Sequence, residues 1–145
     1  MKPFFAYNVA DYFQHWLSLG EKYGPKGNLP KIFHINWFRK DENNKFMWPG
    51  FSENSRVLAH VVSRVQNPND KSGVIETPIG LIPKPETLNT QGLQIKPETV
   101  KELLAVDKAQ WAAEAKKYEA FLDSLHVKIP EGIKAQLAEL KKRTQ

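Results

Sequence analysis

Apolar side chains near the start of the chain recur at the spacing of a helix. Residues 8–19 are predicted to form an amphipathic helix whose apolar face carries Val9, Tyr12, Phe13, Trp16 and Leu17. Asn8 fits the N-cap, with Asp11 three positions later, and Gly20 predicts the end of the helix. Residues 21–30 are rich in Gly, Pro and Lys, which predicts a connecting loop.

The following segment alternates like a strand and then turns back. Residues 31–38 (KIFHINWF) are rich in β-forming side chains, which predicts a strand. Residues 39–45 contain turn-forming Asp and Asn, and residues 46–48 return as a short strand before a Pro-Gly pair. We therefore expect a hairpin whose arms bring together four aromatic side chains, Trp37, Phe38, Phe46 and Trp48.

The remainder of the chain is predicted to be mostly helical. A helix begins at Ser52 and Glu53, where the serine can act as cap, and ends before Asn67, which precedes a proline. Residues 67–97 are rich in proline and contain one apolar run, 77–82, which makes an edge strand at most. Three more helices are predicted over 97–105, with Pro97 in its first turn, 108–125, with Asp107 as its cap, and 131–143. The expected fold class is α+β, mostly helical, in a single domain over residues 1–145.

Composition places the chain among soluble globular proteins. Charged residues make up 26% and hydrophobic residues 41%, and no apolar run reaches the roughly 18 residues of a membrane span. We therefore expect no membrane partner, and the cytoplasm is the default location. The absence of cysteine excludes disulfides and thiolate metal sites. The net charge of +5 would favour an anionic partner, but the basic residues of the last helix favour a solvated helix end instead.

Most catalytic and metal-binding patterns are missing. Residues 20–26 are the nearest fragment to a G-x-x-x-x-G-K-S/T phosphate loop, and they lack its lysine and hydroxyl. The four histidines are scattered and do not form a metal-binding pair on one helix face. No serine lies in a nucleophile elbow. The basic residues interleaved with aromatics over residues 31–48 fit a binder of single-stranded RNA, but composition alone favours the explanation that the aromatic side chains are folded into a hairpin core.

One long segment resembles a known family. Residues 36–41 (NWFRKD) and 45–58 (KFMWPGFSENSRVL) closely resemble the nucleotide-base segment of GTP-dependent phosphoenolpyruvate carboxykinases. Residues 1–8 (MKPFFAYN), 15–18 (HWLS), 29–34 (LPKIFH) and 76–84 (ETPIGLIPK) also fit that family. The resemblance covers nearly the whole chain, is strong to about residue 58 and is weaker in the last helices. It implies the C-terminal segment of the family's mixed α/β nucleotide-binding lobe.

The resemblance also implies a reaction and a binding site. Members of the family convert oxaloacetate and GTP to phosphoenolpyruvate, GDP and carbon dioxide, a step of gluconeogenesis, with manganese or magnesium. The guanine pocket would consist of Phe38, Phe46 and Phe51, with Asn54 and the backbone around Ser52 and Glu53 contacting the base edge. Ser52 and Ala6 stand where the family usually has glycine, so the backbone beside the base carries an extra side chain.

The family's other functional groups match no part of the chain. Its phosphate loop, metal ligands, acid-binding arginines and mobile lid all precede the position that matches Met1. We therefore expect a truncated reading frame or an excised piece, with no catalytic residue and no metal ligand of its own. Its expected partners are a guanine nucleotide and the N-terminal part of the enzyme, without which it is expected to be inactive. A stand-alone nucleotide or nucleic-acid binding module is the alternative, although a nucleic acid is not the favoured partner.

Overall fold

The computed structural model describes residues 4–27 and 29–145. The first three residues of the family-like opening segment, and Asn28 of the predicted loop 21–30, lie outside the described residues. The chain divides into two compact units, one made of Met1–Pro30 with Asp107–Gln145 and the other of Lys31–Val106. Compact units are not the same as independently folding domains, so the single domain over 1–145 stays a prediction.

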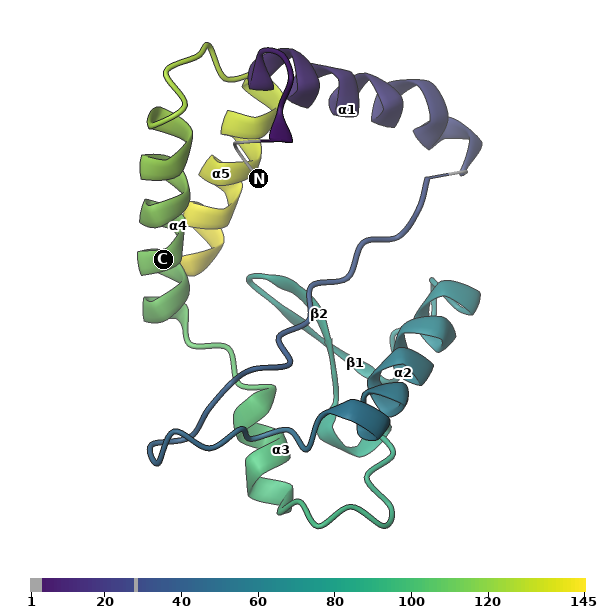
Figure 1. The fold of residues 1–145 in the computed structure, drawn as a ribbon. Coiled ribbons are helices and arrows are strands. Elements are labelled where there is room, and N and C mark those ends of the chain that lie inside the picture. Colours follow the sequence, from purple (N-terminus) through teal and green to yellow (C-terminus); the bar gives the residue numbers. More distant parts are fainter. Residues whose placement is uncertain (1–3, 28) are drawn as a thin grey trace. The chain divides into compact units, whose positions relative to one another are not determined.

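The first unit consists of helices. Its elements are α1 (Val9–Tyr23), a short 3-10 turn η2 (Gly24–Lys26), α4 (Lys108–Asp123) and α5 (Glu131–Thr144). Figure 1 shows α4 and α5 side by side. Ala115 of α4 is fully buried, and the Lys141 ammonium of α5 lies 2.5 Å from the Glu119 carboxylate of α4. A small residue such as Ala115 lets α4 and α5 approach each other closely. The apolar spacing in the sequence pointed to larger side chains instead and did not identify this alanine.

The N-caps of α1 and α4 are the residues that the sequence predicts, but the predicted end of α1 is wrong. Asn8 Oδ1 accepts a hydrogen bond from Ala10 N at 2.8 Å, and Asp107 Oδ1 accepts one from Ala109 N at 2.8 Å. The predicted stop at Gly20 is wrong, because α1 continues to Tyr23. A glycine inside a helix lowers helix stability by only about 1 kcal/mol relative to alanine, and the helix-forming residues on either side of Gly20 offset this loss. The chain leaves the helical direction at Gly27, whose φ of 69° suits glycine.

The second unit combines helices with a small sheet. Its elements are a 3-10 turn η3 (Phe51–Glu53), α2 (Asn54–Gln66), β1 (Val74–Thr77), β2 (Gly80–Pro83), a 3-10 turn η4 (Pro85–Thr87) and α3 (Pro97–Leu103). The two strands form an antiparallel hairpin in which Val74 pairs with Pro83 and Thr77 with Gly80. Both strands are edge strands, as predicted for the apolar run, although the first strand begins before that run. The fold class α+β, mostly helical, is confirmed.

The predicted strands at 31–38 and 46–48 are wrong. Residues 31–36 form no ladder, and only an isolated bridge joins Lys40 to Phe46. Ile32, at the centre of the expected strand, is 84% exposed. A β-pattern makes a strand only where a partner supplies hydrogen bonds and a covering face, and the second unit supplies neither here. Its core lies elsewhere, in the buried side chains of Met47, Trp48, Val74, Leu88 and Val100.

Candidate functional site

A tight turn brings two of the predicted phenylalanines together. Asp41 Oδ1 accepts hydrogen bonds from the backbone N of Asn43 and Lys45, both at 2.9 Å, which fixes an Asx-type turn. The turn sets the rings of Phe38 and Phe46 edge to face, with centroids 6.1 Å apart and planes at 60°. The expected proximity of the two arms is therefore confirmed for this pair, although no regular strands form.

A basic side chain anchors this turn to α3. Arg39 Nη1 donates to the carbonyl oxygen of Glu102 at 2.7 Å and to that of Leu103 at 3.3 Å, at the end of the helix. A cation at a helix C-terminus satisfies carbonyls that have no partner within the helix. The segment that carries Phe38 and Phe46 is thereby held to a regular element, although its own backbone is irregular.

The three candidate phenylalanines lie at the surface. Phe38 is 72% exposed, Phe46 is 59% exposed and Phe51 is 96% exposed, whereas Trp48 is only 6% exposed. The explanation of these aromatics as a hairpin core is therefore wrong for Phe38 and Phe46, whereas Trp48 is buried as that explanation expects. Rings with so much of their surface in water contribute little to the core and remain available for contact with a ligand.

Phe51 also has an unusual backbone. Its φ is 28°, in the left-handed region that side chains with a Cβ rarely adopt, and it follows Gly50, whose φ is 80°. Such a conformation costs on the order of 1–3 kcal/mol and occurs most often at functional sites. Among the described residues the structure shows no ring contact between Phe51 and either Phe38 or Phe46.

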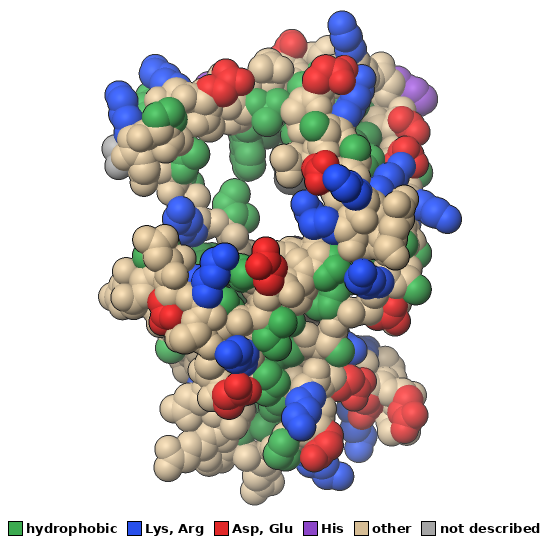
Figure 2. All heavy atoms as spheres, turned by 180° about the vertical axis from the view of Figure 1, so that it is seen from behind, with side chains coloured by type: hydrophobic (Ala, Val, Ile, Leu, Met, Phe, Trp, Pro, Cys, Tyr) green, Lys and Arg blue, Asp and Glu red, His purple; other side chains and the backbone are tan. Residues whose placement is uncertain are grey.

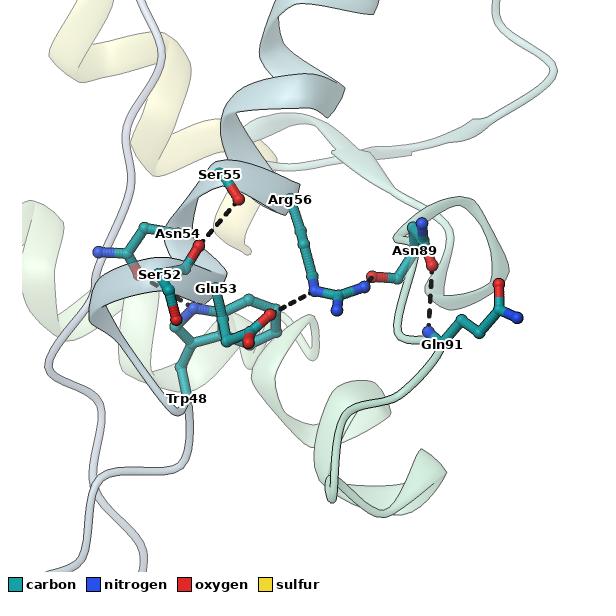
Figure 3. Close-up of polar contacts among 8 residues, drawn as sticks. All are labelled: Trp48, Ser52, Glu53, Asn54, Ser55, Arg56, Asn89 and Gln91. Carbon is teal, nitrogen blue, oxygen red and sulfur yellow. Dashed lines mark hydrogen bonds and ion pairs between the residues drawn. The ribbon is translucent and has the colours of Figure 1, made fainter.

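Asn54 begins α2 and contacts the core tryptophan. Trp48 Nε1 donates to Asn54 Oδ1 at 3.1 Å, and Figure 3 shows the amide nitrogen of Asn54 pointing away from this bond. An indole N–H can only donate, so the oxygen end of the amide has to face it. Among the described residues the Nδ2 group makes no hydrogen bond, so its two N–H donors remain available to a ligand.

The other two polar candidates differ from each other. The Glu53 carboxylate is 2.5 Å from Arg56 Nε, and Arg56 Nη1 donates to the carbonyl oxygen of Asn89 at 2.8 Å (Figure 3). Glu53 is therefore committed to holding the start of α2 against the loop at Asn89. Ser52 is exposed within η3 and makes no capping bond to α2, so its predicted capping role is wrong. Asn54 is the polar candidate best placed to contact a ligand.

Sequence reasoning missed three residues of this arrangement, Trp48, Arg56 and Asn89. The spacing of Glu53 and Arg56, three apart on one helical turn, was a usable signal. The link from Arg56 to Asn89 spans 33 positions and the Trp48 bond joins a core residue to a helix start, so neither follows from local pattern.

Among the described residues, no group of three or more His, Asp or Glu side chains converges as a metal site would require. None of the helices described has both the length and the apolar composition to cross a membrane. On the face shown in Figure 2, Lys and Arg side chains are interspersed with Asp and Glu.

Comparison with known proteins gives consistent matches. A family model described as the phosphoenolpyruvate carboxykinase C-terminal P-loop domain matches residues 1–143. Two relatives named phosphoenolpyruvate carboxykinase (GTP), one from Treponema pallidum subsp. pallidum and one from Treponema pallidum strain Nichols, are each 49% identical over 116 residues. These residues are 80% of this chain but only 18% of each relative, so the chain spans less than a fifth of their length.

Proposed function

Because the chain belongs to the family of GTP-dependent phosphoenolpyruvate carboxykinases, we propose that it supplies the guanine-binding part of such an enzyme. The proposed reaction takes oxaloacetate and GTP to phosphoenolpyruvate, GDP and carbon dioxide. Loss of carbon dioxide leaves an enolate, whose oxygen accepts the γ-phosphoryl group. Two observations carry the proposal: Phe38, Phe46 and Phe51 are exposed, and the Asn54 amide has its oxygen engaged by Trp48 while its N–H donors stay available.

The phenylalanines supply affinity for the base. Stacking of a nucleobase on an aromatic side chain contributes about 1–3 kcal/mol and depends little on which base is bound. The paired rings of Phe38 and Phe46 and the exposed ring of Phe51 offer such surfaces without any prior rearrangement of the core. Since base stacking is the main term available to this chain, and about 3 kcal/mol corresponds to a Kd on the order of 10 mM, we expect GDP to bind it only weakly.

Asn54 supplies the choice between bases. Guanine carries an acceptor, O6, at the position where adenine carries a donor, the N6 amino group. With Oδ1 engaged by Trp48, Asn54 presents Nδ2, which can donate to guanine O6 and is opposed by the adenine amino group. We propose that Ser52 and Glu53 contribute backbone groups to the same base edge.

Phosphoryl transfer requires groups from elsewhere. The chain has no phosphate loop, and its described residues do not fit a manganese or magnesium site. We therefore propose that the rest of the enzyme binds the metal and the phosphates. The isolated chain is expected to be inactive as a carboxykinase. A cytoplasmic location completes the proposal.

The test is a titration of the chain with GTP, ATP and a short single-stranded RNA, each at low and high salt. The proposal predicts that GTP binds more tightly than ATP and that its affinity changes little with salt. An RNA affinity that exceeds that for GTP and falls steeply with salt would identify a nucleic-acid binder and contradict the proposal. Turnover of oxaloacetate with GTP by the isolated chain would contradict the assignment of catalysis to other parts.

A further inference from the structure

Trp48 is a core residue whose one polar atom contacts the residue proposed to select the base. It is 6% exposed, and its Nε1 donates to Asn54 Oδ1 at 3.1 Å (Figure 3). We propose that Trp48 is a positioning residue that sets the base preference, by holding the Asn54 amide in the orientation that suits guanine. This inference rests on the proposed function and concerns the same site.

The chemistry of the pair allows one orientation of the amide. A carboxamide has an acceptor at one end and two donors at the other, whereas the indole N–H is a donor only. If the amide turned over, Nδ2 would face Trp48 Nε1, and two donors would meet with no acceptor between them. Because Trp48 is buried, its N–H could not turn to water instead, and an unsatisfied buried donor is unfavourable.

The surrounding contacts prevent the two residues from separating. Trp48 lies in the core of the second unit beside buried Met47. The backbone N of Asn54 donates to the carbonyl oxygens of Phe51 and Ser52, which fixes the start of α2. Two residues later, Arg56 bridges Glu53 and the Asn89 carbonyl. These contacts hold the Asn54 backbone close to the indole, so the side-chain amide stays within reach of Trp48 Nε1.

Discrimination then follows from two coupled hydrogen bonds. In the observed orientation Nδ2 can donate to guanine O6. Adenine presents its amino group at that position, so binding adenine well would require the amide to turn over and lose the bond from Trp48. Without the indole N–H the amide could turn freely, and it would present Oδ1 to adenine as readily as Nδ2 to guanine.

Trp48→Phe removes the indole N–H and keeps an aromatic ring. In the 145-residue chain, Kd values for GDP and ADP are measured by NMR titration. The ratio of Kd for ADP to Kd for GDP should fall by about 5-fold to 10-fold, the scale of one neutral hydrogen bond. Trp111→Phe, the same replacement in α4, is the matched control and should leave the ratio unchanged. An unchanged ratio in Trp48→Phe would overturn the inference.

A double-mutant cycle separates positioning from general packing. If Trp48 acts through Asn54, adding Trp48→Phe to an Asn54→Ala variant should not change the ratio of Kd for ADP to Kd for GDP any further. An equal fall in both backgrounds would show a packing effect and overturn the inference. IDP, which keeps O6 but lacks the 2-amino group, should follow GDP in every variant, and behaviour like that of ADP would exclude O6 as the group that is read.

A measurement on the unaltered chain does not depend on the stability of any variant. Solvent exchange of the Trp48 Nε1 proton should be slower than that of Trp111 and should remain slow when GDP is bound, because the bond to Asn54 persists. Fast exchange in the GDP complex would overturn the inference even if the chain prefers guanine. A chain that binds GDP and ADP equally well would overturn the proposed function itself.

Discussion

Replacing Phe51 with alanine separates a binding role from a structural one. Phe51 is 96% exposed, so only about 4% of its surface is removed from water. Full burial of a phenylalanine contributes about 1.5–3 kcal/mol, and 4% of that is roughly 0.1 kcal/mol. Since alanine keeps the Cβ and hence the strain at φ 28°, Phe51→Ala should change the free energy of unfolding by less than about 0.5 kcal/mol.

The same replacement should weaken nucleotide binding much more. Loss of one stacking surface costs about 1–3 kcal/mol, which corresponds to a rise in the Kd for GDP of about 5-fold to 150-fold. Phe51→Gly should weaken binding similarly but stabilise the fold relative to Phe51→Ala by about 1 kcal/mol, because glycine adopts a positive φ without strain.

The assay pairs chemical denaturation with an NMR titration of GDP on each variant. Val100→Ala is the control, since Val100 is 5% exposed in α3 and its truncation should cost about 1–3 kcal/mol of stability while leaving the Kd unchanged. A loss of more than about 1 kcal/mol of stability in Phe51→Ala, with GDP binding unaffected, would refute the reasoning and identify the ring as structural.

Three further predictions concern stability. Asn8→Ala removes the cap of α1 and should cost about 1 kcal/mol in denaturation, whereas an equally stable variant would show that the cap is redundant. Arg56→Ala breaks the ion pair with Glu53, in which the two side chains are only 22% and 29% exposed, and should lower the free energy of unfolding by about 1–2 kcal/mol. Lys117→Ala is the control: its lysine side chain is 70% exposed, so the loss should be less than about 0.5 kcal/mol. Burial, and secondly the charge of Arg64, hold the pKa of His60 in the folded chain below its ordinary 6.5. Because the folded chain favours the neutral imidazole, the stability that His60 contributes is fully present above pH 6.5 and is lost as the pH falls through the folded-state pKa. His60→Gln should therefore flatten the dependence of stability on pH between about 7 and about 5, and an unchanged slope would contradict it.

The helices could be predicted because their signals are local. Apolar spacing, together with caps at Asn8 and Asp107 and a proline at Pro97, located α1, α4 and α3 to within a few residues. Gly20 failed as a stop because one unfavourable residue is outweighed by the turns on either side. The strand at 31–38 failed for a different reason: a strand needs a partner, and the local pattern does not say whether one is available.

The candidate site could be predicted only in part. Phe38, Phe46, Phe51 and Asn54 were identified through a family resemblance, since apolar composition alone would have placed the rings in a core. The exposure of Phe51, its positive φ and the bond between Trp48 and Asn54 depend on how the backbone turns between Trp48 and η3. These features are set by packing, and no spacing rule in the sequence encodes them.

The most direct test of the central claim is a nuclear Overhauser experiment on the chain with bound GDP. The account predicts contacts from the guanine H8 proton to the rings of Phe38, Phe46 and Phe51, and it predicts that ADP at the same concentration gives weaker ones. Saturable GDP binding in which the guanine proton contacts none of these three rings would contradict the account.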